Sequence, residues 1–259
     1  MKIERFGVLS DIHIPFHDKR ALELAINIFQ ELNLDIIILL GDVVDFYNVN
    51  MHQKNKHPGV LATIEDEINA GLEFRHRIET LFPKAQKIWH EGNHLYRLER
   101  YVVDKAPGLF NYLRAKEMLG LTENNDWEFV PYNEKRWFKD CNLFMQHSPP
   151  SYSENLAGTC LKKKPDASAI YGCAHRVDYF CSKGVNGTYE VFNMPWLGST
   201  DATDEHKKVF SYIKNHDRWS KGFGVGTVKD GKDFDFQTVR IHEDEKYWCI
   251  IDGCYYEED

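Results

Sequence analysis

The sequence predicts a protein of the α/β class, and three features of the chain carry this prediction. Over residues 1–182, apolar runs typical of strands alternate with segments of helical periodicity. From about residue 183 the segments become short and rich in aromatic and β-branched residues, which indicates antiparallel hairpins. Short polar signatures follow five of the predicted strands. We therefore expect one domain over residues 1–259, in which residues 183–259 are mainly antiparallel strands that complete a second sheet packed on the first.

The predicted elements follow from local patterns. Asp18 is a plausible N-cap for a first helix, and Ile36–Leu40 is almost continuously apolar, as expected for a strand covered on both faces. The predicted helices span residues 18–32, 60–81, 95–104 and 107–119. The predicted strands span residues 3–9, 36–40, 88–89, 143–145, 169–171, 187–193, 222–229, 233–241 and 246–251.

The composition is that of an ordinary globular protein, with 42% hydrophobic and 28% charged residues. No apolar run approaches the roughly 18 residues that a membrane span needs, and residues 1–5 lead directly into a strand, so we expect neither a membrane span nor a signal peptide. The six cysteines show no C-x-x-C spacing, which favours reduced thiols and a cytoplasmic location. The net charge of −8 argues against broad nucleic-acid binding, although bound divalent cations would reverse the sign locally.

The five polar signatures are the most informative part of the chain. Ligands collect beyond the carboxyl ends of strands in an open α/β sheet, so donors at five strand ends predict one metal site. The signatures are Asp11-Ile12-His13, Gly41-Asp42-Val43-Val44-Asp45, Gly92-Asn93-His94, His147 and Gly172-Cys173-Ala174-His175.

The residue types in these signatures indicate the chemistry. Asp11 and His13 are two positions apart, so an extended backbone would point both to one face. Asp42 is the natural bridge between two ions, because a carboxylate has two oxygens. Mixed oxygen and imidazole donors favour Mn²⁺, Fe or Zn²⁺ over an ion that prefers thiolates alone. Each signature is weak by itself, and the ordered set carries the prediction.

In this order, D-x-H, G-D-x-x-D, G-N-H, H and G-x-x-H, the signatures resemble those of the calcineurin-like metallophosphoesterases over residues 6–176. The contexts of residues 41–47 and 92–101, together with Trp219-x-x-Gly222-Phe223, resemble a branch found in phage and prophage genomes. The resemblance implies a four-layer α/β/β/α sandwich with two packed mixed sheets. It also implies two divalent metal ions, with Mn²⁺ expected first and Fe, Zn²⁺ or Ni²⁺ as alternatives.

The resemblance also implies roles for single residues. Asp11, His13, Asp42 and His175 would hold the first ion, and Asp42, Asn93 and His147 would hold the second. His94 would protonate the leaving group or hold the phosphate, and Asp45 would be a supporting carboxylate.

Cys173 departs from the family pattern, which has G-H-x-H where this chain has Gly172-Cys173-Ala174-His175. Three outcomes are open for this thiol. It could ligate the second ion, stand aside while water fills the position, or be a buried apolar thiol in a one-metal enzyme. We rank the second outcome first, because the surrounding donors are rich in oxygen.

Three further residues are candidate substrate ligands: Arg97, Arg100 and His52, the last with His57 in a polar loop. Ordinary surface charges and a solvated loop are the alternatives. We expect a metal-dependent phosphoesterase, first of the phosphodiesterase or nuclease type, with a nucleic acid or nucleotide as substrate. The alternatives are a phosphomonoesterase acting on nucleotides or phosphoproteins, and a degenerate member that binds metal or a partner without catalysis.

Overall fold

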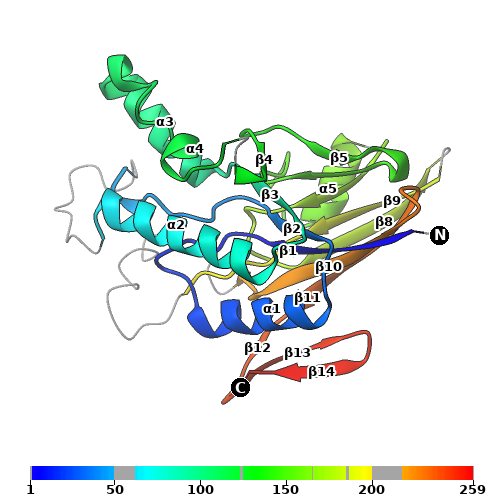
Figure 1. Cartoon of the computed structure of the whole chain (residues 1–259). Coiled ribbons are helices and arrows are strands. Elements are labelled where there is room, and N and C mark those ends of the chain that lie inside the picture. The colour runs from blue at the N-terminus through cyan, green and yellow to red at the C-terminus, as the bar shows by residue number, and fades with distance from the viewer. Residues whose placement is uncertain are drawn as a thin grey trace.

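Two mixed β-sheets face each other, and helices cover their outer faces (Figure 1). The structure is a computed structural model that describes residues 2–49, 62–122, 125–164, 166–184, 187–199 and 218–258. This arrangement is the four-layer α/β/β/α sandwich that the resemblance of the five signatures implies.

The first sheet has six strands in the order β11-β10-β1-β2-β3-β4. Its four strands from β1 to β4 run parallel, whereas β10 and β11 are antiparallel additions beside β1. The bounds are β1 Ile3–Leu9, β2 Ile36–Leu39, β3 Gln86–His90, β4 Trp127–Val130, β10 Gly222–Lys229 and β11 Asp233–Arg240.

The second sheet has five strands in the order β5-β6-β7-β9-β8. Its central strands β6, β7 and β9 are parallel, and β5 and β8 pair antiparallel at the two edges. The bounds are β5 Arg136–Phe138, β6 Leu143–Gln146, β7 Ser168–Tyr171, β8 Asp178–Gly184 and β9 Gly187–Asn193. A separate three-stranded sheet follows at the C-terminus: β12 His242–Glu243, β13 Tyr247–Ile251 and β14 Cys254–Glu257.

Two of the helices begin at side-chain caps that the sequence encodes. Asp18 accepts a hydrogen bond from the backbone of Ala21 and starts the first helix, as predicted. Thr63 and Asp66 form a reciprocal capping box at the start of the second. The α-helices are α1 Lys19–Glu31, α2 Ile64–Leu81, α3 Asn93–Lys105, α4 Ala115–Met118 and α5 Leu156–Lys163, and the 3₁₀ helices are η1 Tyr47–Val49, η3 Pro107–Leu109 and η5 Lys139–Cys141.

Strand alternation divides the apolar residues among three layers of core. In β2, Ile36 and Ile38 face the second sheet, whereas Ile37 and Leu39 face the helices α1 to α3. A third cluster packs α5 against the outer face of the second sheet through Leu161 and Tyr171. Each fully buried large apolar side chain contributes about 1.5–3 kcal/mol, so these layers fix how the strand ends meet.

Two expectations about the fold are wrong. Residues 222–240 do not complete the second sheet, because β10 and β11 extend the first sheet beside β1. The predicted helix over residues 107–119 is instead η3 and the single turn of α4. The Pro107-Gly108 pair at its start has low helix propensity, which explains the interruption.

In the part of the chain that the structure describes, no helix is both long and apolar enough to cross a membrane.

Candidate metal centre

The polar signatures meet where the parallel strands of both sheets end. Asp11 follows β1, Asp42 follows β2, and Asn93 follows β3 as the first residue of α3. His147 follows β6 and His175 follows β7, so the facing sheet supplies two of the imidazoles, and His13 comes from the first sheet. One rim of the sandwich therefore collects donors from segments far apart in the sequence.

The backbone reaches this rim through left-handed conformations and not through the extended one that the sequence suggested. The φ angles are 54° at Asp11, 59° at His13, 48° at Asp42, 63° at Cys173 and 59° at His175. Such angles cost non-glycine residues free energy and persist only where surrounding contacts hold them. Backbone hydrogen bonds from Asp11 to the Gly41 carbonyl (3.1 Å) and from His13 to the Asp42 carbonyl (3.0 Å) do so here.

The first donor cluster consists of Asp11, His13 and His175. Nε2 of His175 lies 2.9 Å from Oδ1 of Asp11 and 3.4 Å from Nε2 of His13. Nδ1 of His13 lies 2.8 Å from Oδ2 of Asp45 and donates to it, which leaves its Nε2 lone pair facing the cluster. All three side chains are buried. The cluster offers a carboxylate and two imidazoles to one ion.

The second donor cluster consists of Asp42, His147 and Cys173, with Asn93 beside them. Nε2 of His147 lies 3.1 Å from Oδ2 of Asp42 and 3.2 Å from Oδ1 of Asn93. Sγ of Cys173 lies 3.1 Å from the same Asn93 oxygen. Its position among the donors favours ligation over a thiol that stands aside.

The hydrogen bonding of His147 tests whether this second set fits a cation. Nδ1 of His147 donates to the Leu40 carbonyl at 2.6 Å, so Nε2 presents a lone pair to the oxygens of Asp42 and Asn93. Acceptors that face each other in a buried site need a shared positive charge. Without an ion a proton takes that place: burial lowers the pKa of His147, but the Asp42 carboxylate outweighs it and holds that pKa well above its usual value. The residues therefore fit a divalent ion.

The two clusters adjoin. Oδ1 of Asp11 lies 4.0 Å from Nε2 of His147, which links the first cluster to the second. Oδ1 of Asp42 accepts a 2.8 Å hydrogen bond from the backbone of His94, so Oδ2 is the oxygen left to face the donors. Burial acts to raise the pKa of Asp42, but His147 and His94 hold it well below its usual range, so Asp42 is ionised.

Glycines allow this close approach at two positions. Gly41 has a φ of 92°, and a side chain there would overlap the ring of His147. A side chain at Gly92 would overlap Asp42. The glycines of the second and third signatures are therefore needed for the contacts between strand ends.

Asp45 connects the site histidines as a positioning residue. Its Oδ2 lies 3.2 Å from Nδ1 of His94 and its backbone carbonyl lies 3.0 Å from the same nitrogen. The same Oδ2 also accepts the hydrogen bond from Nδ1 of His13, so Asp45, His13 and His94 form one hydrogen-bond network. These three residues also lie close enough together to hold an ion. Nε2 of His94 is left facing the second cluster, 3.7 Å from Oδ2 of Asp42.

The predicted substrate ligands have different positions. Arg97 contacts Asp45, with its Nη1 3.3 Å from the backbone carbonyl and 3.8 Å from Oδ1. Arg100 is exposed and lines a surface hollow along α3 with Glu99 and Asp104. His52 and His57 lie outside the described residues. Arg97 therefore supports the network around Asp45, and substrate contacts by Arg100 and His52 stay predictions.

Sequence reasoning missed the side chains that surround the donors. The Tyr152 hydroxyl donates to Sγ of Cys173 at 3.2 Å, and Ser10 donates to Oδ2 of Asp11. The ring of His175 stacks on Trp196, with centroids 5.1 Å apart, and Trp219 meets it edge-on at 4.2 Å. Ser10 had a local signal, because it directly precedes a predicted ligand, and Trp219 had one as part of the Trp219-x-x-Gly222-Phe223 pattern.

Comparison with known proteins identifies the family of this chain. The sequence model of the calcineurin-like phosphoesterases matches residues 4–184, which include every proposed donor. The chain belongs to the calcineurin-like phosphoesterase family. The resemblance inferred from the five signatures is thereby confirmed.

Two curated phage proteins are similar to part of this family member. The Gene 54 protein of Mycobacterium phage L5 is 25% identical over 121 residues, and that of Mycobacterium phage D29 is 26% identical over 110 residues. The matches cover 46% and 42% of the present chain, and they span 47% and 43% of the relatives, less than half of their length. They agree with the predicted resemblance to a phage branch.

Solved structures of related architecture show low similarity throughout. Vps29 from Chaetomium thermophilum is 12% identical with a TM-score of 0.45, and the match covers 99% of this chain and 98% of that one. Yfce, a phosphoesterase from E. coli, is 14% identical with a TM-score of 0.40, over 86% of this chain and 90% of its own.

Proposed function

We propose that this calcineurin-like family member is a divalent-metal-dependent phosphoesterase that cleaves a phosphodiester, in the manner of a nuclease or phosphodiesterase. The observation that carries the proposal is the pair of adjoining donor clusters, Asp11/His13/His175 and Asp42/His147/Cys173, with Nε2 of His94 facing the second. The family match supports phosphoester chemistry at these donors.

Each cluster would hold one divalent ion. Such a pair supplies Lewis-acid polarisation of the phosphoryl oxygens and lowers the pKa of a bound water toward neutrality. The carboxylates of Asp11 and Asp42 provide hard donors that suit Mn²⁺. The imidazoles of the site are borderline donors, and Cys173 adds one soft donor that suits Zn²⁺ or Fe. We retain Mn²⁺ as the first expectation for the pair.

The protein's own contribution to the reaction lies in His94 and Asp45. Asp45 accepts from Nδ1 of His94, which leaves Nε2 free to carry a proton toward the leaving oxygen. Asp45 is ionised, because burial acts to raise its pKa but His94 and His13 hold that pKa far below its usual value. His94 is therefore the proposed acid, with Asp45 as the group that orients it.

Charge favours a diester over a monoester. A phosphomonoester carries about 1.5 to 2 negative charges at neutral pH, whereas a diester carries one. Arg97 is engaged with Asp45 and is not free to compensate the extra charge of a monoester. A singly charged phosphodiester therefore suits the site better.

The test is hydrolysis of bis-p-nitrophenyl phosphate and p-nitrophenyl phosphate by the purified protein with added Mn²⁺ or Zn²⁺. We expect a higher kcat/KM for the diester and no activity after chelation. A higher value for the monoester would indicate a phosphomonoesterase. Hydrolysis of neither substrate, with any divalent metal, would indicate a member that binds metal or a partner without catalysis.

A further inference from the structure

A cavity of about 330 Å³ lies at the carboxyl ends of β3 and β4, against α3 and α4. Its volume is within the range of ligand pockets, about 300–1,000 Å³. The residues that matter here are Glu91, Tyr96, Arg114, Lys116, Phe129 and Tyr132. None of them belongs to the donor clusters described above.

The cavity is a neighbour of the metal centre. Glu91 precedes Asn93 by two residues, and Tyr96 follows His94 by two, so the turn from β3 into α3 serves both sites. On the other side, the Ser148 hydroxyl lies 3.4 Å from the hydroxyl of Tyr132, and Ser148 directly follows His147. Both sites occupy the same rim of the first sheet, where β3 and β4 are adjacent strands. A ligand held at the metal centre could extend into this cavity.

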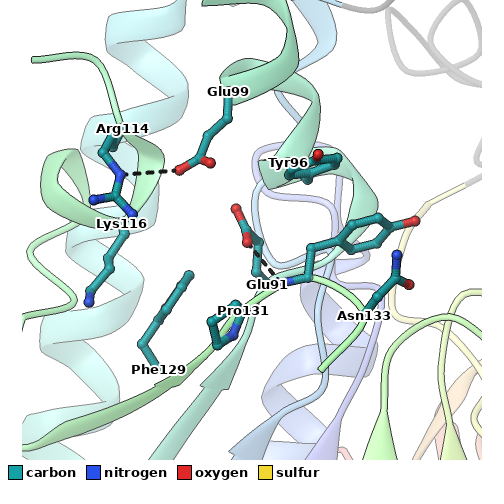
Figure 2. Close-up of a pocket in the computed structure, with 9 residues that line it drawn as sticks. Glu91, Tyr96, Glu99, Arg114, Lys116, Phe129, Pro131 and Asn133 are labelled. Carbon is teal, nitrogen blue, oxygen red and sulfur yellow. Dashed lines mark hydrogen bonds and ion pairs between the residues drawn. The ribbon is translucent and has the colours of Figure 1, made fainter. Parts of the chain in front are cut away.

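Glu91 gives the cavity an acceptor that the protein itself leaves unused. The residue is 5% exposed, and its Oε2 accepts a 2.9 Å hydrogen bond from the backbone of Tyr132. Its other oxygen, Oε1, is buried and has no hydrogen-bond partner among the residues that the structure describes. Figure 2 shows the carboxyl group of Glu91 directed to the space between Tyr96 and Glu99. Buried polar groups are normally paired, so this oxygen points to a ligand that donates.

Aromatic rings form part of the cavity wall, and Arg114 and Lys116 lie on its far side beside Glu99. The rings of Tyr96 and Tyr132 stack with centroids 4.7 Å apart and planes inclined by 19°. Nζ of Lys116 lies over the ring of Phe129, 5.3 Å from its centroid. Arg114 stands beside Lys116, and its Nε lies 3.7 Å from a Glu99 oxygen (Figure 2). The cavity therefore offers planar surfaces, an acceptor on one side and donors on the other.

We propose that this cavity binds the guanine base of a nucleotide phosphoester whose phosphate lies at the metal centre. Guanine presents two neighbouring N–H donors, at N1 and the 2-amino group, that match the carboxylate of Glu91. Its O6 and N7 acceptors, on the adjoining edge of the base, match Arg or Lys. Its planar ring matches the aromatic walls. The proposal rests on the phosphoesterase function proposed above and names the substrate class of the same site.

The binding test uses phosphonate analogues, in which a methylene group replaces the ester oxygen and prevents hydrolysis. We measure their dissociation constants for the Mn²⁺-loaded protein by titration calorimetry. The guanosine analogue should bind at least about tenfold more tightly than methylphosphonate, which has no base. The inosine analogue lacks the 2-amino donor and should bind more weakly than the guanosine analogue. A base that adds no affinity, or a preference for uridine or inosine, overturns the proposal.

Variants locate the effect in the cavity. Glu91→Gln keeps an acceptor for the Tyr132 backbone but turns a donor toward the base. This variant should bind the guanosine analogue about tenfold or more weakly and should bind methylphosphonate with unchanged affinity. Lys116→Ala, at a half-buried position, provides a second variant that does not depend on the fold around Glu91. Glu73→Gln, the same change on the exposed face of α2, should alter nothing. Unchanged guanosine affinity in both cavity variants contradicts the assignment.

The same protein preparation separates the two proposals. Hydrolysis of bis-p-nitrophenyl phosphate without any affinity for the base would support the phosphoesterase function and contradict the guanine pocket. Base affinity that depends on Glu91, without hydrolysis of any phosphoester, would retain the pocket and remove the catalytic function.

Discussion

Sγ of Cys173 lies 3.1 Å from Oδ1 of Asn93, within the second donor cluster of the metal centre. The Tyr152 hydroxyl donates to the same sulfur at 3.2 Å. From the sequence we expect first that the thiol does not bind the ion. The position of Cys173 among the donors favours a thiol that ligates it instead.

Cys173 should therefore be visible in the spectrum of a metal-substituted protein. We expect the Co²⁺-loaded chain to show a thiolate-to-metal charge-transfer band that Cys173→Ser removes. That variant should also weaken Zn²⁺ binding at the second cluster by more than about 100-fold, the upper value for residues that only support a ligand. Cys181→Ser, at an exposed free cysteine, serves as the control and should keep the band. A band that persists in Cys173→Ser would show that Cys173 does not ligate the metal ion.

Asp42→Asn should remove the second ion while the fold is kept. Asp42 has a φ of 48°, a conformation that asparagine also adopts readily, so the change removes charge without backbone strain. The loss in kcat should exceed about 100-fold, the upper value for residues that only support a ligand. Elemental analysis and circular dichroism measure metal content and fold. Asp252→Asn makes the same change at an exposed position with a φ of 50°. Two ions per chain in Asp42→Asn would rule out its role as a shared ligand.

His94→Ala should lower kcat more than metal content. General acid catalysis contributes on the order of 10²–10⁴-fold, and this loss should appear with substrates whose leaving groups need a proton. A p-nitrophenolate leaving group needs little protonation, so the loss with bis-p-nitrophenyl phosphate should be smaller. Steady-state kinetics on alkyl and p-nitrophenyl diesters measure the difference. Equal losses on both classes would assign His94 to phosphate binding.

Glu67 should make the stability of the chain depend on pH. Burial raises the pKa of Glu67 to about 8, an effect to which Asp45 adds and which the Tyr47 backbone N–H and Arg97 reduce. The unfolded chain releases this proton above about pH 4.3, whereas the folded chain keeps it until about pH 8. The unfolded state therefore binds fewer protons between these values, and the free energy of unfolding falls as the pH rises.

The variant Glu67→Gln isolates this effect. Between pH 5 and pH 8 the free energy of unfolding should fall by about 3–4 kcal/mol more in the wild type than in the variant, because each pKa unit corresponds to about 1.4 kcal/mol. Urea unfolding of the metal-free proteins at both pH values measures it, with Glu73→Gln as the exposed control. Parallel pH profiles for wild type and Glu67→Gln would show that Glu67 ionises normally.

The donors could be predicted because each is encoded by a local pattern. Asp11, Asp42 and His147 each lie two residues after a short apolar run, and the carboxyl ends of parallel strands meet at one rim. Such runs identify strands without knowledge of their partners. For this reason the strands predicted over residues 3–9, 36–40, 143–145 and 222–241 lie close to the observed bounds of β1, β2, β6, β10 and β11.

Only the tertiary structure decided which strands pair and how the backbone turns at the site. The pattern of β10 shows a buried strand, but its place beside β1 depends on packing against residues more than 200 positions away. The left-handed conformations of Asp11 and Cys173 likewise depend on contacts that no local sequence contains. The sequence by itself determined which side chains reach the rim. Long-range contacts decided their distances, the thiol's place among the donors and the cavity beside them, because such geometry is set by packing of distant segments.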